Sequence, residues 1–365
     1  MNRSLIIDGI HIHDASDAYV IAEIGHNHQG SVEKAEKMIS AAKESGASAV
    51  KLQKRDNRTL FTEEVYNKPY ENENSFGSTY GEHREALEFG KAAYEQLINF
   101  SKSVGITLFA TAFDMPSVHF LADLEMPAYK VASGDLKNTP LIRAIAKVGK
   151  PMIISTGGGT MEDVRRAYAA AREFNEHVAL LQCTSAYPVN FEEMDLNVIT
   201  TYREEFPEAV IGLSGHDNGI AMSVAAYMLG ARIVEKHFTL DRAMKGTDHA
   251  FSLEPLGLKK MVRDLNRVRV ACGSTQKRVF ASEQSALQKM GKQLVAARDL
   301  PTGHRITPAD IAIKSPGGGI PPYALDLLIG QTIIKPLKKD EAFRMEYFPV
   351  KEKAELVTLS RGRGK

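Results

Sequence analysis

Short apolar runs alternate with amphipathic segments from Tyr19 to about Glu235. The apolar runs predict eight strands, near residues 20, 50, 108, 130, 153, 180, 212 and 234. Between them, apolar positions at helical spacing, as in 32–42 and from Met161 onward, predict helices. Eight strand–helix units in roughly 260 residues are typical of a TIM (β/α)8 barrel. No G-x-G-x-x-G motif follows the first strand, as a dinucleotide-binding sheet would require. We therefore expect an α/β fold built on a closed barrel.

Several segments flank or interrupt this pattern. Residues 5–12 predict a hairpin that turns at Asp8-Gly9, ahead of the barrel. The polar stretch 54–88 has little apolar periodicity, so it is either a functional loop or a disordered one. Beyond the barrel, short β-like pieces between Pro and Gly turns predict a small β-rich domain. The predicted division is a barrel domain with its hairpin over 1–275, a linker over 276–291, the β-rich domain over 292–350 and a tail over 351–365.

The overall charge is close to neutral, with 46 Lys and Arg against 45 Asp and Glu and a net charge of +1. This balance gives no reason to expect a nucleic-acid or membrane partner, so functional basic residues should surround a local anionic ligand. The spacing of the two cysteines, Cys183 and Cys272, is typical of neither a disulfide framework nor a metal site. The sequence contains neither an apolar signal segment nor a run long enough to span a membrane. We expect a cytoplasmic protein.

Two histidines mark neighbouring strand ends. His216 follows the strand near 212 and His237 the strand near 234, and their separation of 21 residues is about one strand–helix–strand unit. Because adjacent parallel strands end at the same edge, the two imidazoles should converge there. Neutral imidazoles in that arrangement suit a divalent metal. The alternative is that one or both are ordinary polar residues in a loop.

Polar side chains also gather at the other strand ends, where the active site of a barrel lies. Lys51 and Lys130 stand in apolar strands, where a lysine is costly to bury without an anionic partner. Together with nearby hydroxyl groups, they match the many acceptor oxygens of a phosphate. These hydroxyls belong to Thr111, Ser133, Ser155, Ser185 and Ser214. A lone serine at a strand end is more often a turn former. Glu23, a carboxylate in an apolar strand, is a candidate for proton transfer or for orienting water.

Seven motifs, in order along the chain, resemble those of the sialic acid synthase family, which makes N-acetylneuraminate and other nonulosonic acids. They are AEIGHNHQG (22–30), AVKLQK (49–54), PAYKVASGD (127–135), LLQCTSAYP (180–188), GLSGHDNGIAMSVAA (212–226), EKHFTLD (235–241) and KGTDHAFSLEP (245–255). The C-terminal region is similar to the antifreeze-like (SAF, β-clip) domain that these enzymes carry. The resemblance covers nearly the whole chain and implies a TIM barrel followed by that domain.

This resemblance implies a transferase that joins phosphoenolpyruvate to a mannosamine-type sugar, giving a nine-carbon 2-keto sugar acid and phosphate. It implies that His216 and His237 hold a divalent metal that polarises the sugar aldehyde, usually Mn²⁺, with Mg²⁺ or Co²⁺ as alternatives. Glu23 matches the carboxylate at the reacting centre. The two lysines and the hydroxyl groups match phosphoenolpyruvate-binding positions, except Ser155, which we add from its place at a strand end. The sugar-binding positions are matched by Gln53, Tyr187 and Asp248.

The polar insertion and the C-terminal domain carry further indications. Residues 67–90 resemble the vertebrate-type branch, which uses a 6-phosphorylated sugar, and Tyr80, His83 and Arg84 could bind that phosphate if they lie over the mouth. A loop that merely covers the site is the alternative. The resemblance also implies a homodimer in which the SAF domain reaches the partner's active site. Lys314 is followed by Ser315, where the bacterial branch has an arginine that reaches the sugar's acyl group, so the resemblance does not extend to that contact.

The sequence leaves several activities open. The product could be N-acetylneuraminate, its 9-phosphate, or a related legionaminic, pseudaminic or deaminated acid. Other phosphoenolpyruvate synthases, which make seven- or eight-carbon keto acids, lack the antifreeze-like domain and fit less well. A non-catalytic sugar-binding barrel has no need of the intact set Glu23, Lys51, Lys130, His216 and His237.

Overall fold

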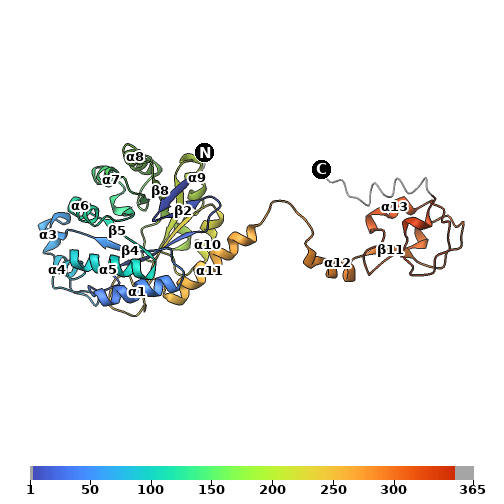
Figure 1. Ribbon diagram of the computed structural model, residues 1–365, viewed down its shortest axis with the longest axis horizontal. Coiled ribbons are helices and arrows are strands. Elements are labelled where there is room, and N and C mark those ends of the chain that lie inside the picture. Colours follow the sequence, from blue (N-terminus) through green and yellow to red (C-terminus); the bar gives the residue numbers. More distant parts are fainter. Residues whose placement is uncertain (1–2, 350–365) are drawn as a thin grey trace. The chain divides into compact units, whose positions relative to one another are not determined.

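Eight parallel strands close into a barrel in the computed structural model, which describes residues 3–349. Each strand lies beside the next one in the chain, and β10 closes the barrel against β3. The strands are β3 (Tyr19–Gly25), β4 (Ala49–Lys54), β5 (Thr107–Ala112), β6 (Tyr129–Val131), β7 (Met152–Ser155), β8 (Val178–Cys183), β9 (Val210–Gly215) and β10 (Ile233–His237). The predicted TIM barrel is confirmed (Figure 1), and each predicted strand position falls within an observed strand.

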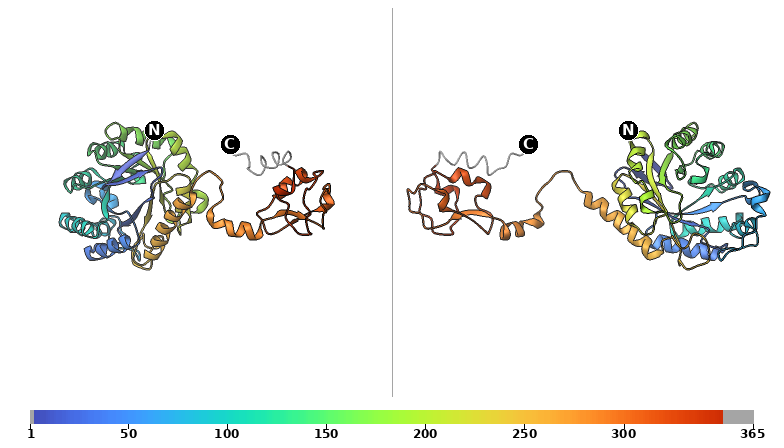
Figure 2. Two further views of the ribbon diagram at one scale, coloured as in Figure 1. Left: turned by 45° about the vertical axis from the view of Figure 1, so that its right-hand side comes forward. Right: turned by 180° about the vertical axis from the view of Figure 1, so that it is seen from behind.

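Helices surround the barrel, and local sequence signals explain where they begin and end. They are α1 (Val32–Glu44), α5 (Lys91–Val104), α6 (Met115–Asp123), α7 (Thr139–Lys147), α8 (Met161–Arg172), α9 (Val198–Glu205), α10 (Ala221–Met228) and α11 (Pro255–Cys272). The Ser31 side chain accepts a hydrogen bond from the Lys34 amide and so caps α1. Gly105 ends α5 with φ 71°, a left-handed conformation that glycine adopts without strain. Figure 2 shows these helices around the strands from two further directions.

The predicted N-terminal hairpin closes one end of the barrel. It consists of β1 (Ser4–Ile7) and β2 (Ile10–His13), with the left-handed residues Asp8 and Gly9 at the turn. Its buried side chains Leu5, Ile7 and Ile12 belong to the same apolar cluster as residues inside the barrel such as Phe109. The Thr107 hydroxyl, at the start of β5, donates to the Asp8 carboxylate over 2.9 Å. Because this hairpin covers the ends where strands begin, polar chemistry is left to the ends where strands finish.

The polar insertion between β4 and α5 is an ordered segment of short helices. They are α2 (Asn57–Leu60), α3 (Glu63–Tyr66) and α4 (Tyr80–Glu85). Each begins at a capping residue, respectively Asp56, Thr62 and Thr79. At Gly81 an added Cβ would lie 2.4 Å from the Tyr66 ring, so the absence of a side chain allows α4 to pack on α3. Helices this short show no periodicity in the sequence, because one turn cannot display an apolar stripe.

A second compact unit begins at Ser274, after the first ends at Gly273. The residues predicted as a linker contain α12 (Gln284–Met290), and an antiparallel pair follows, β11 (Gln293–Ala296) with β12 (Ile311–Lys314). One further helix, α13 (Leu325–Leu328), completes the unit. Its core contains Leu294, Leu300, Ile306, Leu328, Ile333, Phe343 and Phe348. The predicted tail, 351–365, lies outside the described residues. Between residues 3 and 349, no helix has the length and apolar character needed to cross a membrane.

Candidate active site

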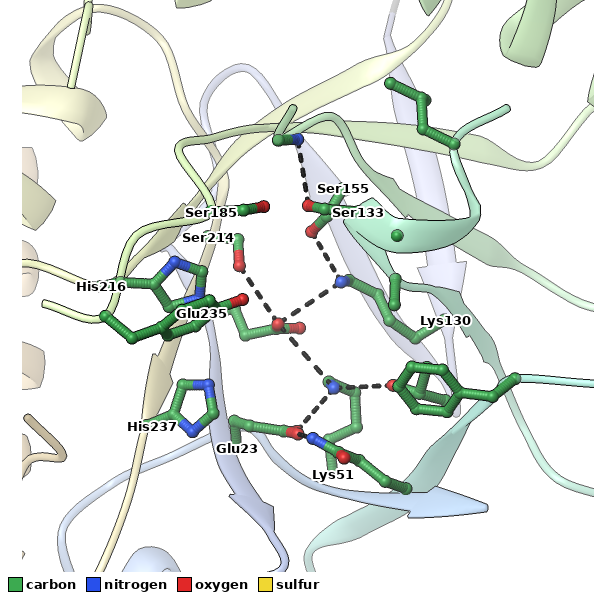
Figure 3. A pocket seen from close by; sticks show the side chains of 18 of the residues that line it. Glu23, Lys51, Lys130, Ser133, Ser155, Ser185, Ser214, His216, Glu235 and His237 are labelled. Atoms are coloured by element: carbon green, nitrogen blue, oxygen red, sulfur yellow. Dashed lines mark hydrogen bonds and ion pairs between the residues drawn. The ribbon is translucent and has the colours of Figure 1, made fainter. Parts of the chain in front are cut away.

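A cavity of about 500 Å³ opens at the ends of the barrel strands. Most of the predicted site residues line it: Glu23, Lys51, Gln53, Arg84, Thr111, Lys130, Ser133, Ser155, Ser185, Tyr187, Ser214, His216, His237 and Asp248. Figure 3 shows the two lysines and the two imidazoles on different sides of this space, with Glu235 between them. Tyr80 and His83 are not among the described residues that line the cavity. The residues chosen from separate strand ends therefore share one site, apart from two in the insertion.

The centre of the cavity holds two lysines and two carboxylates, all at most 5 % exposed. The Lys51 ammonium lies 2.6 Å from Glu23 Oε2 and 3.8 Å from Glu235 Oε1, and the Lys130 ammonium lies 3.4 Å from Glu235 Oε1. Strand register explains the grouping, because Glu23 pairs with Lys51 on one side and with His237 on the other. Each lysine also donates to one hydroxyl. Lys51 donates to Thr111 over 2.8 Å, and Lys130 donates to Ser155 over 2.6 Å.

The two carboxylates differ in their electrostatic environment. Burial alone would raise the pKa of Glu235, but the positive charges of Lys130 and Lys51 outweigh it and lower the pKa to about 2. Burial raises the pKa of Glu23, with the nearby Lys51 charge opposing that rise only in part. Burial also lowers the pKa of Lys130, against the attraction of Glu235. Glu235 is therefore the fixed counter-charge of the lysines, and Glu23 is the carboxyl that can exchange a proton.

Hydroxyl groups surround the cavity beside Lys130. The Gly157 amide donates to Ser133 Oγ over 3.0 Å, and Ser214 Oγ donates to Glu235 Oε1 over 3.3 Å. A Cβ added at Gly157 would lie 2.2 Å from Ser185 Oγ and 2.8 Å from Ser133 Oγ. A glycine is therefore required here so that the two hydroxyls can approach the same space. Gly157 was not among the predicted site residues, because its role depends on two serine hydroxyls that come from other strands.

The two predicted metal ligands lie together at the other side of the cavity. The ring centroids of His216 and His237 are 5.5 Å apart. His216 Nδ1 lies 2.9 Å from the Thr184 carbonyl oxygen, which requires a proton on Nδ1 and leaves the lone pair on Nε2. His237 Nδ1 is buried without a hydrogen-bond partner, and burial lowers the pKa of this ring, so it is neutral at pH 7.

These features fit a divalent metal better than a structural role. An orphaned buried nitrogen beside a second imidazole with a free lone pair is the donor set that such an ion needs. Within residues 3–349, no group of three or more His, Cys, Asp or Glu side chains could hold a metal ion. A metal held by His216 and His237 would thus keep most of its coordination positions for water and substrate.

A run of contacts leads from this centre toward the insertion. Gln53 Nε2 donates to Glu23 Oε1 over 2.6 Å, and Arg55 donates to Gln53 Oε1 over 2.7 Å. Arg55 also lines the cavity but was not selected from the sequence. A usable signal was present, since Lys51 and Gln53 alternate along β4 and Arg55, directly after its end, continues that two-residue spacing. Asp248 lies nearby, with Oδ2 3.7 Å from His237 Nδ1.

The three residues predicted to bind a sugar phosphate occupy different places. Arg84 lines the cavity. The Tyr80 hydroxyl accepts one hydrogen bond from Arg84 Nε at 3.0 Å and another from a terminal nitrogen of Arg84 at 2.8 Å. His83 is 2 % exposed and accepts a hydrogen bond from the Phe76 amide over 3.1 Å. Burial lowers its pKa to about 4, so the ring is neutral at pH 7. His83 therefore supports the fold of the insertion.

Comparison with known proteins gives matches along almost the whole chain. Residues 38–277 match the family model described as the NeuB family, and residues 292–346 match that of the SAF domain. The chain is 40% identical to the N-acetylneuraminate-9-phosphate synthase of Homo sapiens over 329 residues, covering 90% of this chain and 92% of that protein. It is 33% identical to the N,N'-diacetyllegionaminic acid synthase of Campylobacter jejuni over 329 residues, covering 89% of this chain and 98% of that protein.

A solved structure is also similar. The crystal structure of the N-acetylneuraminic acid (sialic acid) synthetase from Leptospira borgpetersenii, in complex with citrate, matches with a TM-score of 0.68 and 31% identity. The match covers 78% of this chain and 95% of that one. The fold of this chain therefore has a solved counterpart.

Proposed function

The chain belongs to the NeuB family, and on that premise we propose that it condenses phosphoenolpyruvate with an N-acetylmannosamine-type sugar and water. The products are phosphate and a sialic acid, which is N-acetylneuraminate if the sugar is free and its 9-phosphate if the sugar carries a 6-phosphate. Relatives that are sialic acid synthases identify the chain as a transferase. The observation that carries the proposal is the pair of buried lysines facing two histidines across one cavity.

Phosphoenolpyruvate fits the lysine side of the cavity. Its phosphate and carboxylate carry several negative charges, which Lys51 and Lys130 can bind with charge-assisted hydrogen bonds. The hydroxyl groups of Ser133, Ser185 and Ser214 supply further donors. Because Glu235 holds both ammonium groups in place before the substrate arrives, little side-chain freedom is lost on binding.

The sugar occupies the side formed by the histidines, Gln53, Tyr187 and Asp248. Bound to His216 and His237, a divalent ion (Mn²⁺, or alternatively Mg²⁺ or Co²⁺) would supply Lewis-acid polarisation of the sugar aldehyde. The Tyr187 ring lies 4.1 Å from that of His216 between centroids and covers this part of the cavity. Gln53, held by Glu23 and Arg55, is placed to donate to or accept from a sugar hydroxyl.

The proton transfers of the reaction fall to Glu23. C3 of phosphoenolpyruvate forms the new bond to the aldehyde carbon, and the aldehyde oxygen gains a proton. Water adds to C2 and loses one proton. The C2–O bond to phosphate then breaks as C2 becomes a ketone, and the remaining hydroxyl proton leaves with the phosphate as hydrogen phosphate. A carboxyl whose pKa burial has raised can accept the proton from water and deliver one to the alkoxide within the same closed site.

The first experiment measures phosphate release from phosphoenolpyruvate with Mn²⁺ and either N-acetylmannosamine or its 6-phosphate. We expect release that depends on both metal and sugar. The His237→Ala variant should lose this activity and bind Mn²⁺ more weakly by calorimetry, while its melting temperature stays near that of the parent. The matched control is His11→Ala in the exposed hairpin strand. Full activity of the His237 variant contradicts the metal assignment, and no sugar-dependent release contradicts the reaction.

A related nonulosonic acid is the second candidate product, because the chain is also similar to a legionaminic acid synthase. Replacing N-acetylmannosamine by a 2,4-diacetamido sugar in the same assay separates the two, and the higher kcat/KM identifies the substrate. A non-catalytic sugar-binding barrel is the least supported function, since it gives no reason to bury Glu23 beside Lys51. Release of phosphate by the protein excludes it.

We also propose a cytoplasmic homodimer in which the SAF domain reaches the partner's active site. At the place where the bacterial branch has an arginine that reaches the sugar's acyl group, this chain has Ser315, directly after Lys314. The Lys314 side chain forms an ion pair with Asp340 of its own domain. Light scattering coupled to gel filtration measures the mass in solution, and a monomeric mass with full activity contradicts the dimer.

A further inference from the structure

Asn27, in the turn between β3 and α1, is a buried asparagine that connects separate stretches of the chain. It is 2 % exposed, and it is not among the described residues that line the cavity. Its Nδ2 donates to the Phe238 carbonyl oxygen over 2.9 Å and to Ser252 Oγ over 3.0 Å. Because a carbonyl oxygen can only accept, the amide must present its nitrogen to Phe238. Both protons of this one NH₂ group are therefore used to hold other segments in place.

The first of these hydrogen bonds acts on the segment that carries His237. Phe238 follows His237 directly, and its backbone N–H donates to the Glu23 carbonyl oxygen over 2.8 Å. The His237 carbonyl oxygen accepts from the Leu253 amide, also over 2.8 Å. Asn27 holds the next carbonyl along the chain, that of Phe238. The backbone that follows His237 is therefore fixed from several sides, and with it the direction in which the imidazole leaves the strand.

The second hydrogen bond leads to Asp248. Ser252 is 3 % exposed, and its Oγ donates to the Asp248 carbonyl oxygen over 2.5 Å. A serine hydroxyl carries a single proton, so toward Asn27 the same oxygen can only accept. Asp248 lines the cavity, and its Oδ2 lies 3.7 Å from His237 Nδ1. Asn27 is thus connected to both members of this pair, to His237 through Phe238 and to Asp248 through Ser252.

We propose that Asn27 is a positioning residue, which holds the His237 imidazole and the Asp248 carboxylate in the arrangement that the metal and the sugar require. The inference rests on the proposed function, in which His237 binds the metal and Asp248 the sugar. An asparagine suits this place because one NH₂ group offers two donors, whereas an aspartate would offer none to either acceptor. The two lysines lie on a different side of the cavity (Figure 3), so phosphoenolpyruvate binding should not depend on Asn27.

The test uses two variants that remove different parts of this connection. Asn27→Ala removes both hydrogen bonds. Ser252→Ala keeps the bond of Asn27 to Phe238 and removes only the connection to Asp248, so it tests the proposal even if Asn27→Ala folds poorly.

Asn175→Ala is the matched control. Asn175 is also buried, at 4 % exposed, and its side chain donates to the Lys150 carbonyl oxygen over 2.7 Å and accepts from the His177 amide over 2.8 Å. Lys150 and His177 precede β7 and β8, at the ends of the barrel strands that lie away from the cavity. This variant therefore loses a comparable pair of hydrogen bonds, and melting temperatures show how much stability each variant has lost.

Metal affinity and kinetics should separate Asn27→Ala from the control. Calorimetry should show Mn²⁺ binding that is about tenfold weaker, as is typical when a residue that orients a metal ligand is lost. The KM for the sugar should rise about tenfold, while the KM for phosphoenolpyruvate stays near the parental value. Ser252→Ala should raise the sugar KM with a smaller change in Mn²⁺ affinity. Equal Mn²⁺ affinities and sugar KM values in Asn27→Ala and Asn175→Ala overturn the positioning role.

A measurement without metal or substrate separates this inference from the proposed function. In the metal-free protein, the NMR signals of the His237 ring, assigned with His237→Ala, report the surroundings of that imidazole. They should shift in Asn27→Ala and keep the parental positions in Asn175→Ala. If the parent neither binds Mn²⁺ nor releases phosphate but these shifts occur, the proposed reaction is wrong and Asn27 still positions His237. If the shifts are absent, Asn27 does not position His237, whatever the activity of the parent.

Discussion

The Lys236 ammonium donates to both the carboxylate and the backbone carbonyl oxygen of Asp217, at 2.8 and 2.5 Å. Neither residue is more than 1 % exposed. Asp217 follows His216, and Lys236 precedes His237, so this buried ion pair connects the two chain segments that carry the histidines. A Cβ added at Gly215 would lie 2.9 Å from the Asp217 carboxylate and 3.2 Å from the Lys236 stem, which is why that position has no side chain.

Breaking this pair should weaken metal binding as well as the fold. In Lys236→Met, the Asp217 carboxylate stays buried without its cation, which should lower the free energy of unfolding by about 3 kcal/mol. Denaturant titration measures the loss of stability, and calorimetry with Mn²⁺ measures the affinity of the histidines.

The double variant Lys236→Met/Asp217→Leu serves as the control for charge burial. It should regain much of the lost stability, because no uncompensated charge remains, but it should still bind Mn²⁺ more weakly than the parent. Parental Mn²⁺ affinity in both variants would show that the pair does not position the histidines.

Glu23→Gln should reduce turnover far more than phosphoenolpyruvate binding. The amide keeps the size of the side chain but cannot carry the proton, and loss of a positioned acid–base group typically costs about 100-fold or more in rate. Lys51 and Lys130 keep Glu235 as a counter-charge, so their hold on phosphoenolpyruvate should persist. Steady-state kinetics separate loss of turnover, seen as a lower kcat, from loss of binding, seen as a higher KM for phosphoenolpyruvate. A large rise in that KM with little change in kcat would instead make Glu23 a positioning residue.

Gly157→Ala should raise the KM for phosphoenolpyruvate. The new methyl group would lie within 2.8 Å of two serine oxygens, Ser185 at 2.2 Å and Ser133 at 2.8 Å, so the hydroxyls must move out of their present positions. Losing one or two hydrogen bonds to a charged ligand corresponds to an increase of about tenfold or more. Gly90→Ala is the matched control, because an added Cβ there meets no atom within 4 Å. Similar KM values for the two variants would remove the serines from the binding site.

The second compact unit should lose stability in acid through Asp310. Burial alone would raise the pKa of this carboxyl, but hydrogen bonds from His304, Thr307 and Arg298 prevail and lower it below the ordinary 3.8. A lowered pKa means that the stabilisation is fully present above the unfolded-state value near 3.8 and is lost as the pH falls toward the folded-state value.

Asp310→Asn should destabilise this unit by about 2 kcal/mol at pH 7 and flatten its pH dependence below pH 4. Calorimetric scans of the full chain between pH 2 and 7 follow the transition of this unit. The exposed Asp326→Asn should behave like the parent. An unchanged acid limb in Asp310→Asn would assign the pH dependence to other groups.

The sequence predicted most successfully those features that depend on neighbouring residues, namely the strands and the side chains at their ends. The apolar runs identified all eight strands, and a parallel barrel puts every strand end at one mouth, so the sequence alone was enough to group Lys51, Lys130, His216 and His237. It was least effective in the insertion. His83 and Arg84 are adjacent in the sequence, yet one packs inside the loop and the other lines the cavity, because a one-turn helix points neighbours in different directions.

What the sequence determined by itself is the order of strands and helices and the kinds of side chain at each strand end, since both depend on neighbours within a few residues. Only the tertiary structure decided which of these groups touch. The position of Glu235 between two lysines, the contacts of Asn27 with Phe238 and Ser252, and the ion pair of Lys236 with Asp217 join residues from separate elements. Such contacts depend on strand register and on the packing of loops, which no local pattern of residues encodes.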